Sequence, residues 1–122
     1  MARILVVEDN PDLAQLLADI LQEESHEVIV KSNGASAIQH LEFGELYDLI
    51  ITDLIMPEQD GFDVLEYVQD KGLDTPTLVV SGGGIAVDSE EALKAVEGLA
   101  TAMITKPIKW DVLKAKIREL TG

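Results

Sequence analysis

The sequence predicts an α/β fold, in which a doubly wound parallel β-sheet lies between two layers of helices. Short β-branched apolar runs alternate with helical patterns along the chain, which is typical of a βα-repeating protein with a parallel sheet. The runs are continuously apolar, as strands buried on both faces are, whereas half-exposed strands alternate apolar and polar residues. The chain has 122 residues, the usual size of one domain, so we expect residues 1–122 to fold as one unit.

Five apolar runs are predicted to form the strands of this sheet. A helical pattern follows each run, so the expected order is a strand and then a helix, five times over. Right-handed crossovers between parallel strands place such helices on both faces of the sheet. The predicted strands are residues 4–7, 28–30, 49–52, 77–80 and 102–104.

The first helix is predicted between the first two strands. Asn10 is a suitable N-cap residue, and Pro11 suits the first helical turn because an amide hydrogen there would have no partner within the helix. The apolar residues that follow recur at helical spacings, and they are Leu13, Leu16, Leu17, Ile20 and Leu21.

The second and third helices each show one apolar face. The second is predicted to start after Asn33 and Gly34, and the third follows Gly61. Their apolar positions are Ala37, Ile38 and Leu41 in the second helix, and Val64, Leu65 and Val68 in the third.

The fourth and fifth helices complete the pattern. Asp88 and Glu91 have the spacing of a capping box ahead of the fourth helix, which Gly98 is expected to stop. Trp110 is interpreted as a packing anchor at the start of the last helix. The apolar stripe of that helix consists of Val112, Leu113, Ile117 and Leu120.

The composition indicates a folded and strongly acidic chain. Hydrophobic residues make up 47% and charged residues 26% of the sequence, which excludes a disordered chain. No stretch approaches the ~18 apolar residues that a membrane span requires. The 23 acidic and 9 basic residues give a net charge of −14, which repels phosphate backbones and anionic membranes. We therefore expect no direct nucleic-acid or membrane partner.

The chain contains no cysteine, which excludes disulfides, thiolate metal sites and thiol catalysis. No basic, apolar leader precedes the first apolar run, so we expect a cytoplasmic location. Basic residues gather near the end of the chain, where a solvated helix face is a simpler interpretation than a partner surface. They are Lys106, Lys109, Lys114, Lys116 and Arg118.

Charged and hydroxyl side chains follow four of the predicted strands. Glu8 and Asp9 follow the first strand, Asp53 the third, Ser81 the fourth and Lys106 the fifth. Ligands of doubly wound sheets bind beyond the carboxyl ends of the strands, so these side chains are expected to converge. Three close carboxylates repel one another unless some are protonated or a cation joins them. An all-oxygen set without thiolates suits a hard ion such as Mg²⁺.

Asp53 is the best candidate for a nucleophile at this site. A carboxylate beside a metal ion and an ammonium group can attack a phosphoryl group, because both cations neutralise charge on the transferring oxygens. Asp53 stands alone on its strand, whereas Glu8 and Asp9 are adjacent and better placed to hold the ion. Ser81 would donate its hydroxyl to one phosphoryl oxygen, and Lys106 would pair with another.

Four motifs, taken together and in order, are specific for one known family. They are VVEDN at Val6–Asn10, DLIMPEQDG at Asp53–Gly61, VVSG at Val79–Gly82 and TKPI at Thr105–Ile108. Over its whole length the chain resembles the receiver domain of two-component response regulators, in the form of a single-domain regulator similar to those of chemotaxis. A stand-alone regulator, a relay intermediate and a fragment of a longer protein all stay open.

The resemblance implies a flavodoxin-like sheet with strand order 2-1-3-4-5. It implies that Asp9, Asp53 and the backbone carbonyl of Ile55 hold Mg²⁺, with Glu8 assisting through water. It also implies that Asp53 accepts phosphate from the phosphohistidine of a histidine kinase or a histidine phosphotransfer protein. Such a domain catalyses only its own phosphorylation and dephosphorylation.

The resemblance further implies a cis peptide between Lys106 and Pro107. Phosphorylation would alter a face built from the fourth helix, the fifth strand and the last helix, and a downstream protein would recognise that face. The sequence does not name this target or the cognate kinase. We expect a monomer or a weak dimer.

Three positions distinguish this chain within the family pattern. Met103 stands where receivers commonly carry Tyr or Phe, and flexible methionine favours a packing switch over a ring flip, so it is given no role in the site. Ile55 and Gly83 occupy positions that influence access of water to the phosphoryl group. Neither side chain can orient a nucleophilic water, so spontaneous hydrolysis is predicted to be slow.

Other functions are weighed against this one. An aspartyl-nucleophile phosphohydrolase uses a second acid two residues beyond the nucleophile, where Ile55 stands here. A flavin carrier needs a hydroxyl-rich phosphate loop where Glu8 and Asp9 would repel phosphate. A phosphate-independent binding module would keep the fold but not the chemistry, and the presence of the complete set of site residues argues against it.

The remaining motifs have simpler structural interpretations. His26 and His40 have no second ligand at metal-binding spacing, so both are interpreted as structural or solvated. The triplet Gly82–Gly84 lacks the spacing of a phosphate-binding loop and is interpreted as a mobile loop.

Overall fold

All five predicted strands are present, and they form one parallel sheet in the expected order, β2-β1-β3-β4-β5. The computed structural model describes residues 2–44, 46–53, 61–81, 98–105 and 107–121. The strands are β1 (Arg3–Val7), β2 (Glu27–Lys31), β3 (Leu49–Asp53), β4 (Thr77–Ser81) and β5 (Ala102–Thr105). The helices are α1 (Pro11–Glu23), α2 (Gly34–Glu42), α3 (Gly61–Asp70) and α5 (Trp110–Thr121).

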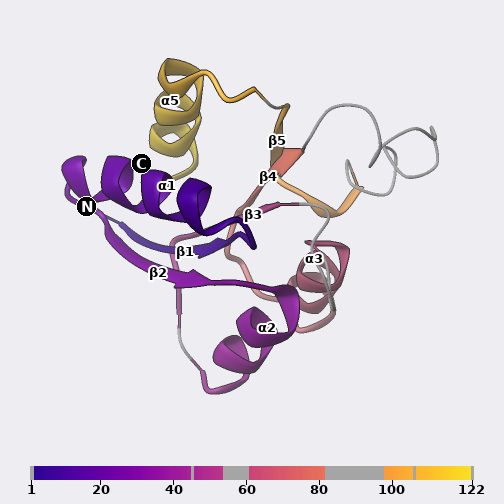
Figure 1. Ribbon diagram of the computed structural model, residues 1–122. Coiled ribbons are helices and arrows are strands. Elements are labelled where there is room, and N and C mark those ends of the chain that lie inside the picture. The colour runs from indigo at the N-terminus through magenta and orange to yellow at the C-terminus, as the bar shows by residue number, and fades with distance from the viewer. Residues whose placement is uncertain (1, 45, 54–60, 82–97, 106, 122) are drawn as a thin grey trace.

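Helices cover both faces of the sheet (Figure 1), as the alternating pattern predicts. Helices α1 and α5 lie on one face, where Leu17 and Leu113 join a buried cluster with apolar side chains of the strands. Helices α2 and α3 lie on the other face, where Leu41 and Val64 join a second cluster. Trp110 packs against the first cluster, which confirms its interpretation as a packing anchor.

Two asparagines start helices as the sequence predicts. The Asn10 side chain accepts hydrogen bonds from the backbone amides of Asp12 (3.0 Å) and Leu13 (3.2 Å) ahead of α1. The Asn33 side chain accepts one from the amide of Ser36 (2.8 Å) ahead of α2. Each cap satisfies amides that have no partner within the helix, which stabilises a protein by about 1 kcal/mol.

Both histidines have structural partners within the described residues. The amide of Ala2 donates a hydrogen bond to Nδ1 of His26 (3.0 Å), which joins the start of β1 to the turn before β2. His40 Nε2 is hydrogen-bonded to the hydroxyl of Tyr47, a buried residue ahead of β3. These contacts confirm the structural interpretation of His26 and His40.

The predicted fourth helix lies mostly outside the described residues, and its expected end at Gly98 is one residue early. Gly98 and Leu99 both have helical conformation. A glycine ends a helix by adopting left-handed backbone, as Gly44 (φ 85°) and Gly72 (φ 64°) do after α2 and α3. Gly98 does not have that conformation, and the helical conformation ends one residue later, at Leu99.

Basic side chains of α5 form ion pairs on the surface. Arg118 and Lys114 contact the carboxylate of Glu24, at the end of α1, at 3.0 and 4.0 Å. Lys116 pairs with Glu119 at 3.4 Å within α5. Exposed pairs contribute little stability, about 0–1 kcal/mol. These three cations therefore fit the interpretation as a solvated, ion-paired helix face.

The described helices are short. Helix α1 is the longest of them, with 13 residues. A helix needs about 20 apolar residues to cross a bilayer. None of the helices in the part of the chain that the structure describes reaches the length and apolarity of a membrane span.

Leu113→Ala is expected to lower the free energy of unfolding by about 2–5 kcal/mol, because the side chain is fully buried between α5 and the sheet. Val112→Ala, on the same helix, is the matched control. Val112 is 47% exposed, so its truncation should change stability by less than about 0.5 kcal/mol. Urea denaturation followed by circular dichroism measures both. Equal losses for the two variants would contradict the placement of α5.

Candidate functional site

Three carboxylates meet at the carboxyl edge of the sheet. Strands β1 and β3 run parallel and in register, with Val7 opposite Thr52, so the residues that follow Val7 emerge beside Asp53. Glu8, Asp9 and Asp53 each offer a carboxylate oxygen, and these oxygens lie within 4.8 Å of one another. Of the residues predicted for the site, these are the three whose side chains the structure describes and brings together.

Alternation along the two strands determines which side chains share a face. In β3, Leu49 and Ile51 join the cluster under α1 and α5, whereas Ile50 joins the cluster under α2 and α3. Consecutive strand residues point to opposite faces, so the side chain of Asp53 points to the same face of the sheet as those of Leu49 and Ile51. In β1, Val6 belongs to the same cluster as Ile51, and the side chain of Glu8, two residues later, points to the same face. The apolar core therefore places both carboxylates on one side of the sheet.

Glu8 is held by main-chain hydrogen bonds on both sides. Its amide donates to the carbonyl of Lys31 (3.0 Å), which continues the β1–β2 ladder by one residue. Its carboxylate oxygen Oε2 accepts from the amide of Asn10 (3.0 Å). Glu8 is only 3% exposed, so this hydrogen bond replaces one that the carboxylate would form with water if it were exposed. The carboxylate is thus fixed toward its two acidic neighbours.

The three acidic residues of the cluster differ in burial. Glu8 is buried, Asp53 is half-buried and Asp9 is exposed. A ligand can therefore approach from the side of Asp9, while Glu8 forms the closed back of the site. The partial positive charge at the N-terminus of α1, which starts at Pro11, also favours negative groups here.

The donor set fits a hard divalent cation. Three negative groups this close repel one another, and either protonation or a cation relieves that repulsion. All three donors are carboxylate oxygens, which suit Mg²⁺ or a similar hard ion rather than a thiolate-preferring one. The cluster can therefore hold such an ion.

The other predicted site residues are described only in part. Ser81 is the last residue of β4, and the register of Asp53 with Val80 puts its backbone at the same edge as the carboxylates. The Ser81 side chain, Ile55, Gly82–Gly84 and Lys106 lie outside what the structure describes. The expected cis peptide before Pro107 lies outside the described residues for the same reason.

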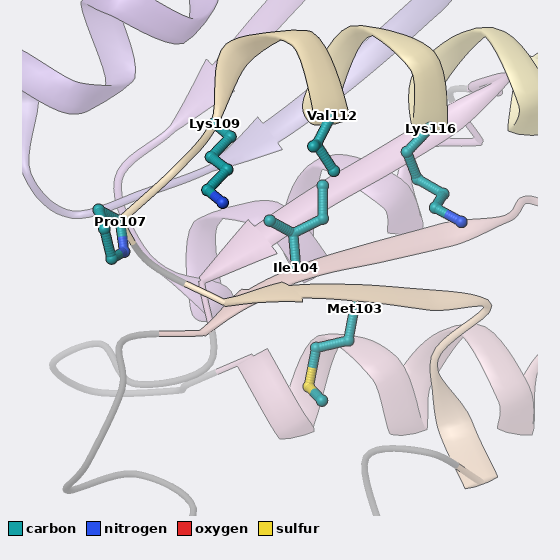
Figure 2. Close-up of a pocket in the computed structure, with 6 residues that line it drawn as sticks. All are labelled: Met103, Ile104, Pro107, Lys109, Val112 and Lys116. Atoms are coloured by element: carbon teal, nitrogen blue, oxygen red, sulfur yellow. The ribbon is translucent and has the colours of Figure 1, made fainter.

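Met103 has a packing role in the structure. It lies in β5 opposite Val79 and packs, half-buried, against the small cluster of Leu65 and Val79. Figure 2 shows Met103 and Ile104 pointing to opposite sides of β5. This agrees with its assignment as a packing residue outside the site.

One contribution to the site was missed from the sequence. Asn10 was predicted only as the cap of α1, yet its backbone amide also fixes the carboxylate of Glu8. An acid placed two residues before a helix cap is a local signal that could have indicated this contact. The same residue therefore connects the start of α1 to the carboxylate cluster.

Comparisons with known proteins agree with this geometry. The family model described as the response regulator receiver domain matches residues 4–118. The transcriptional regulatory protein TcrA of Mycobacterium tuberculosis is 35% identical over 119 residues, which are 98% of this chain and 46% of TcrA. DltR of Streptococcus agalactiae, another transcriptional regulatory protein, is 32% identical over 116 residues, which are 95% of this chain and 50% of DltR. The chain thus spans about half the length of these curated relatives.

Solved structures with similar folds include isolated receiver domains. The receiver domain of the Francisella response regulator 1452 superposes with a TM-score of 0.85 at 26% identity, covering 99% of this chain and 97% of its own. The response regulator TrrA of Thermotoga maritima was solved in complex with Mg²⁺-BeF. It superposes with a TM-score of 0.83 at 32% identity, covering 98% of this chain and 99% of the TrrA chain. With the matched family model spanning nearly all of the sequence, the chain belongs to the response regulator receiver domain family of two-component signalling.

Proposed function

We propose that Asp53 is the phosphoacceptor of this receiver domain. The observation that carries the proposal is the meeting of Asp53 with Glu8 and Asp9, within 4.8 Å, at the ends of two neighbouring parallel strands. The phosphodonor is the phosphohistidine of a histidine kinase or of a histidine phosphotransfer protein. The chain then works as a signalling module of a two-component or phosphorelay pathway.

In the proposed transfer, a carboxylate oxygen of Asp53 forms a bond to phosphorus while the phosphorus–nitrogen bond of phosphohistidine breaks. The histidine nitrogen keeps the electron pair of the broken bond, takes up a proton and leaves as neutral imidazole. Ser81 would donate its hydroxyl to one phosphoryl oxygen, and Lys106 would pair with another. Both groups would lower the negative charge on the transferring phosphoryl group.

Asp9, Asp53 and the backbone carbonyl of Ile55 are the proposed ligands of Mg²⁺, and Glu8 assists through water. When bound, the ion supplies positive charge that neutralises the phosphoryl oxygens. The solved complex of TrrA with Mg²⁺-BeF supports Mg²⁺ as the ion of this site, because TrrA is 32% identical to the chain over nearly its whole length.

The domain would catalyse only its own phosphorylation and dephosphorylation. An aspartyl-nucleophile phosphohydrolase needs a second acid where Ile55 stands, and isoleucine can neither give nor take a proton. We further propose that residues 1–122 form one receiver domain, which acts in the cytoplasm as a monomer or weak dimer.

A groove between β5 and α5 is the proposed surface that a downstream protein recognises (Figure 2). It has a volume of about 310 Å³ and is lined by Met103, Ile104, Pro107, Lys109, Val112 and Lys116. Met103 is one of these lining residues, but its side chain points away from α5 and packs against Leu65 and Val79, whereas the next residue, Ile104, points toward α5 (Figure 2). A change in the packing of Met103 would therefore reach the groove through the backbone of β5, which is how a switch without an aromatic ring would operate.

Asp53→Ala is expected to abolish labelling by a small phosphodonor. The wild-type protein, incubated with the donor and Mg²⁺, should gain one phosphate by intact mass spectrometry and should gain none without Mg²⁺. Asp48→Ala is the control, since Asp48 lies before β3 at the opposite edge of the sheet, where its carboxylate accepts from the amide of Arg3. Labelling that persists without Asp53 would disprove the assignment.

Asp9→Ala is expected to weaken Mg²⁺ binding on the order of tenfold or more, since loss of a metal's hydrogen-bonded outer shell alone costs about 10–100-fold. Isothermal titration calorimetry at millimolar Mg²⁺ measures the affinity. Asp12→Ala removes an exposed carboxylate in the first turn of α1 that is not part of the cluster. Equal weakening by both variants would indicate general loss of negative charge instead of lost coordination.

The phosphorylated protein is expected to lose its phosphate slowly, because neither Ile55 nor Gly83 can orient an attacking water. Decay of the phosphorylated mass, after removal of the donor and in the presence of Mg²⁺, gives the half-life. Ile55→Glu introduces a carboxylate at this position and should shorten it. A wild-type half-life of seconds would contradict the prediction.

A further inference from the structure

A buried hydroxyl directly precedes the phosphoacceptor. Thr52 is the fourth residue of β3, it is 0% exposed, and the residues before it in the strand are all buried and apolar. Polar side chains are rare in the described core, where the buried ones belong to Glu8, Thr52 and Thr77. The position of Thr52 next to Asp53 therefore calls for a physical reason.

Burying a hydroxyl is unfavourable unless it forms a hydrogen bond. The Thr52 hydroxyl donates to the backbone carbonyl oxygen of Asp53 at 2.8 Å. Buried side-chain nitrogen and oxygen atoms in the described residues all have partners, so this core follows the rule. The Thr52 hydroxyl is thus hydrogen-bonded to the main chain of Asp53, the residue proposed to accept phosphate.

The hydrogen bond acts at the point where the sheet ends. Asp53 is the last residue of β3, and its carbonyl belongs to the peptide group that leaves the strand. A hydrogen bond to this carbonyl restricts rotation of that peptide, and with it the backbone from which the Asp53 side chain projects. The carboxylate of Asp53 then keeps its direction toward Glu8 and Asp9.

The hydroxyl does not act on the carboxylate directly. Thr52 and Asp53 are consecutive strand residues, so their side chains point to opposite faces of the sheet. Ile50, two residues before Thr52, packs in the cluster under α2 and α3, whereas Glu8 and Asp53 lie on the side of α1. Any influence of Thr52 on the site therefore passes through the backbone.

From these observations we infer that Thr52 is a positioning residue for phosphoryl acceptance, whose hydroxyl fixes the Asp53 peptide so that the carboxylate is held ready for attack. This inference rests on the proposed function of Asp53. Thr52 touches no reacting atom, and its contribution is to lower the number of orientations that the nucleophile samples.

Thr52→Val tests the inference, because valine replaces the hydroxyl with a methyl group of similar size. The rate of phosphorylation at saturating Mg²⁺ and phosphodonor should fall about two- to tenfold, the range that one net hydrogen bond supports. Thr52→Ser keeps the hydroxyl and should restore most of the rate. Thr52→Ala is a second hydroxyl-free variant, measured on its folded fraction if valine overpacks the site.

Thr77→Val is the matched control. Thr77 is also buried, at the start of β4, and its hydroxyl accepts from the amide of Thr101 (3.1 Å) while its amide donates to the hydroxyl of Thr101 (2.9 Å). It lies at the edge of the sheet opposite the carboxylates. Its loss should lower the urea midpoint without changing the phosphorylation rate.

The outcomes separate the possible explanations. A wild-type rate in Thr52→Val overturns the inference, and so do equal rate losses in Thr52→Val and Thr77→Val, which would reflect stability alone. A slow Thr52→Ser variant also overturns it, because the hydroxyl is then not the cause. Failure of the proposed function itself would appear differently, as absence of labelling in the wild-type protein.

Discussion

Mutual repulsion among Glu8, Asp9 and Asp53 is the constraint on which the site depends. Their carboxylate oxygens lie within 4.8 Å, a separation that charged groups do not adopt unless the fold imposes it. The fold imposes it through the register of β1 with β3, which the apolar residues of both strands hold from two sides. A cation that binds there relieves the repulsion, so ligand binding also stabilises the folded chain.

Main-chain hydrogen bonds give the site its rigidity. The amide of Asn10 holds the carboxylate of Glu8, and the hydroxyl of Thr52 holds the carbonyl of Asp53. Neither contact involves a charged partner, so neither removes the negative charge that a cation needs. The backbone therefore holds the carboxylates in place, while the exposed Asp9 leaves room for a cation to approach.

The sheet also connects the site with a distant surface. Strand β4 ends at Ser81 beside the carboxylates and pairs along its length with β5, where Val79 lies opposite Met103. Met103 packs on Val79 and Leu65, while its neighbour Ile104 points to the other side of β5, toward the groove against α5 (Figure 2). A displacement at the carboxyl end of β4 would reach that groove through β5, because close-packed elements transmit such shifts.

Local sequence patterns by themselves determined the strands, the helix caps at Asn10 and Asn33 and the acidic residues that follow the strands, because each depends on neighbours within one turn or one strand. Four motifs in order were enough to indicate the family. The convergence of Glu8, Asp9 and Asp53 was also expected, from the rule that ligands of doubly wound sheets bind beyond the strand ends. Tertiary structure alone decided how deeply each carboxylate is buried, that His40 bonds Tyr47 and that Glu24 pairs with Arg118. These features depend on strand register and on packing between segments far apart in the chain, which no local window contains.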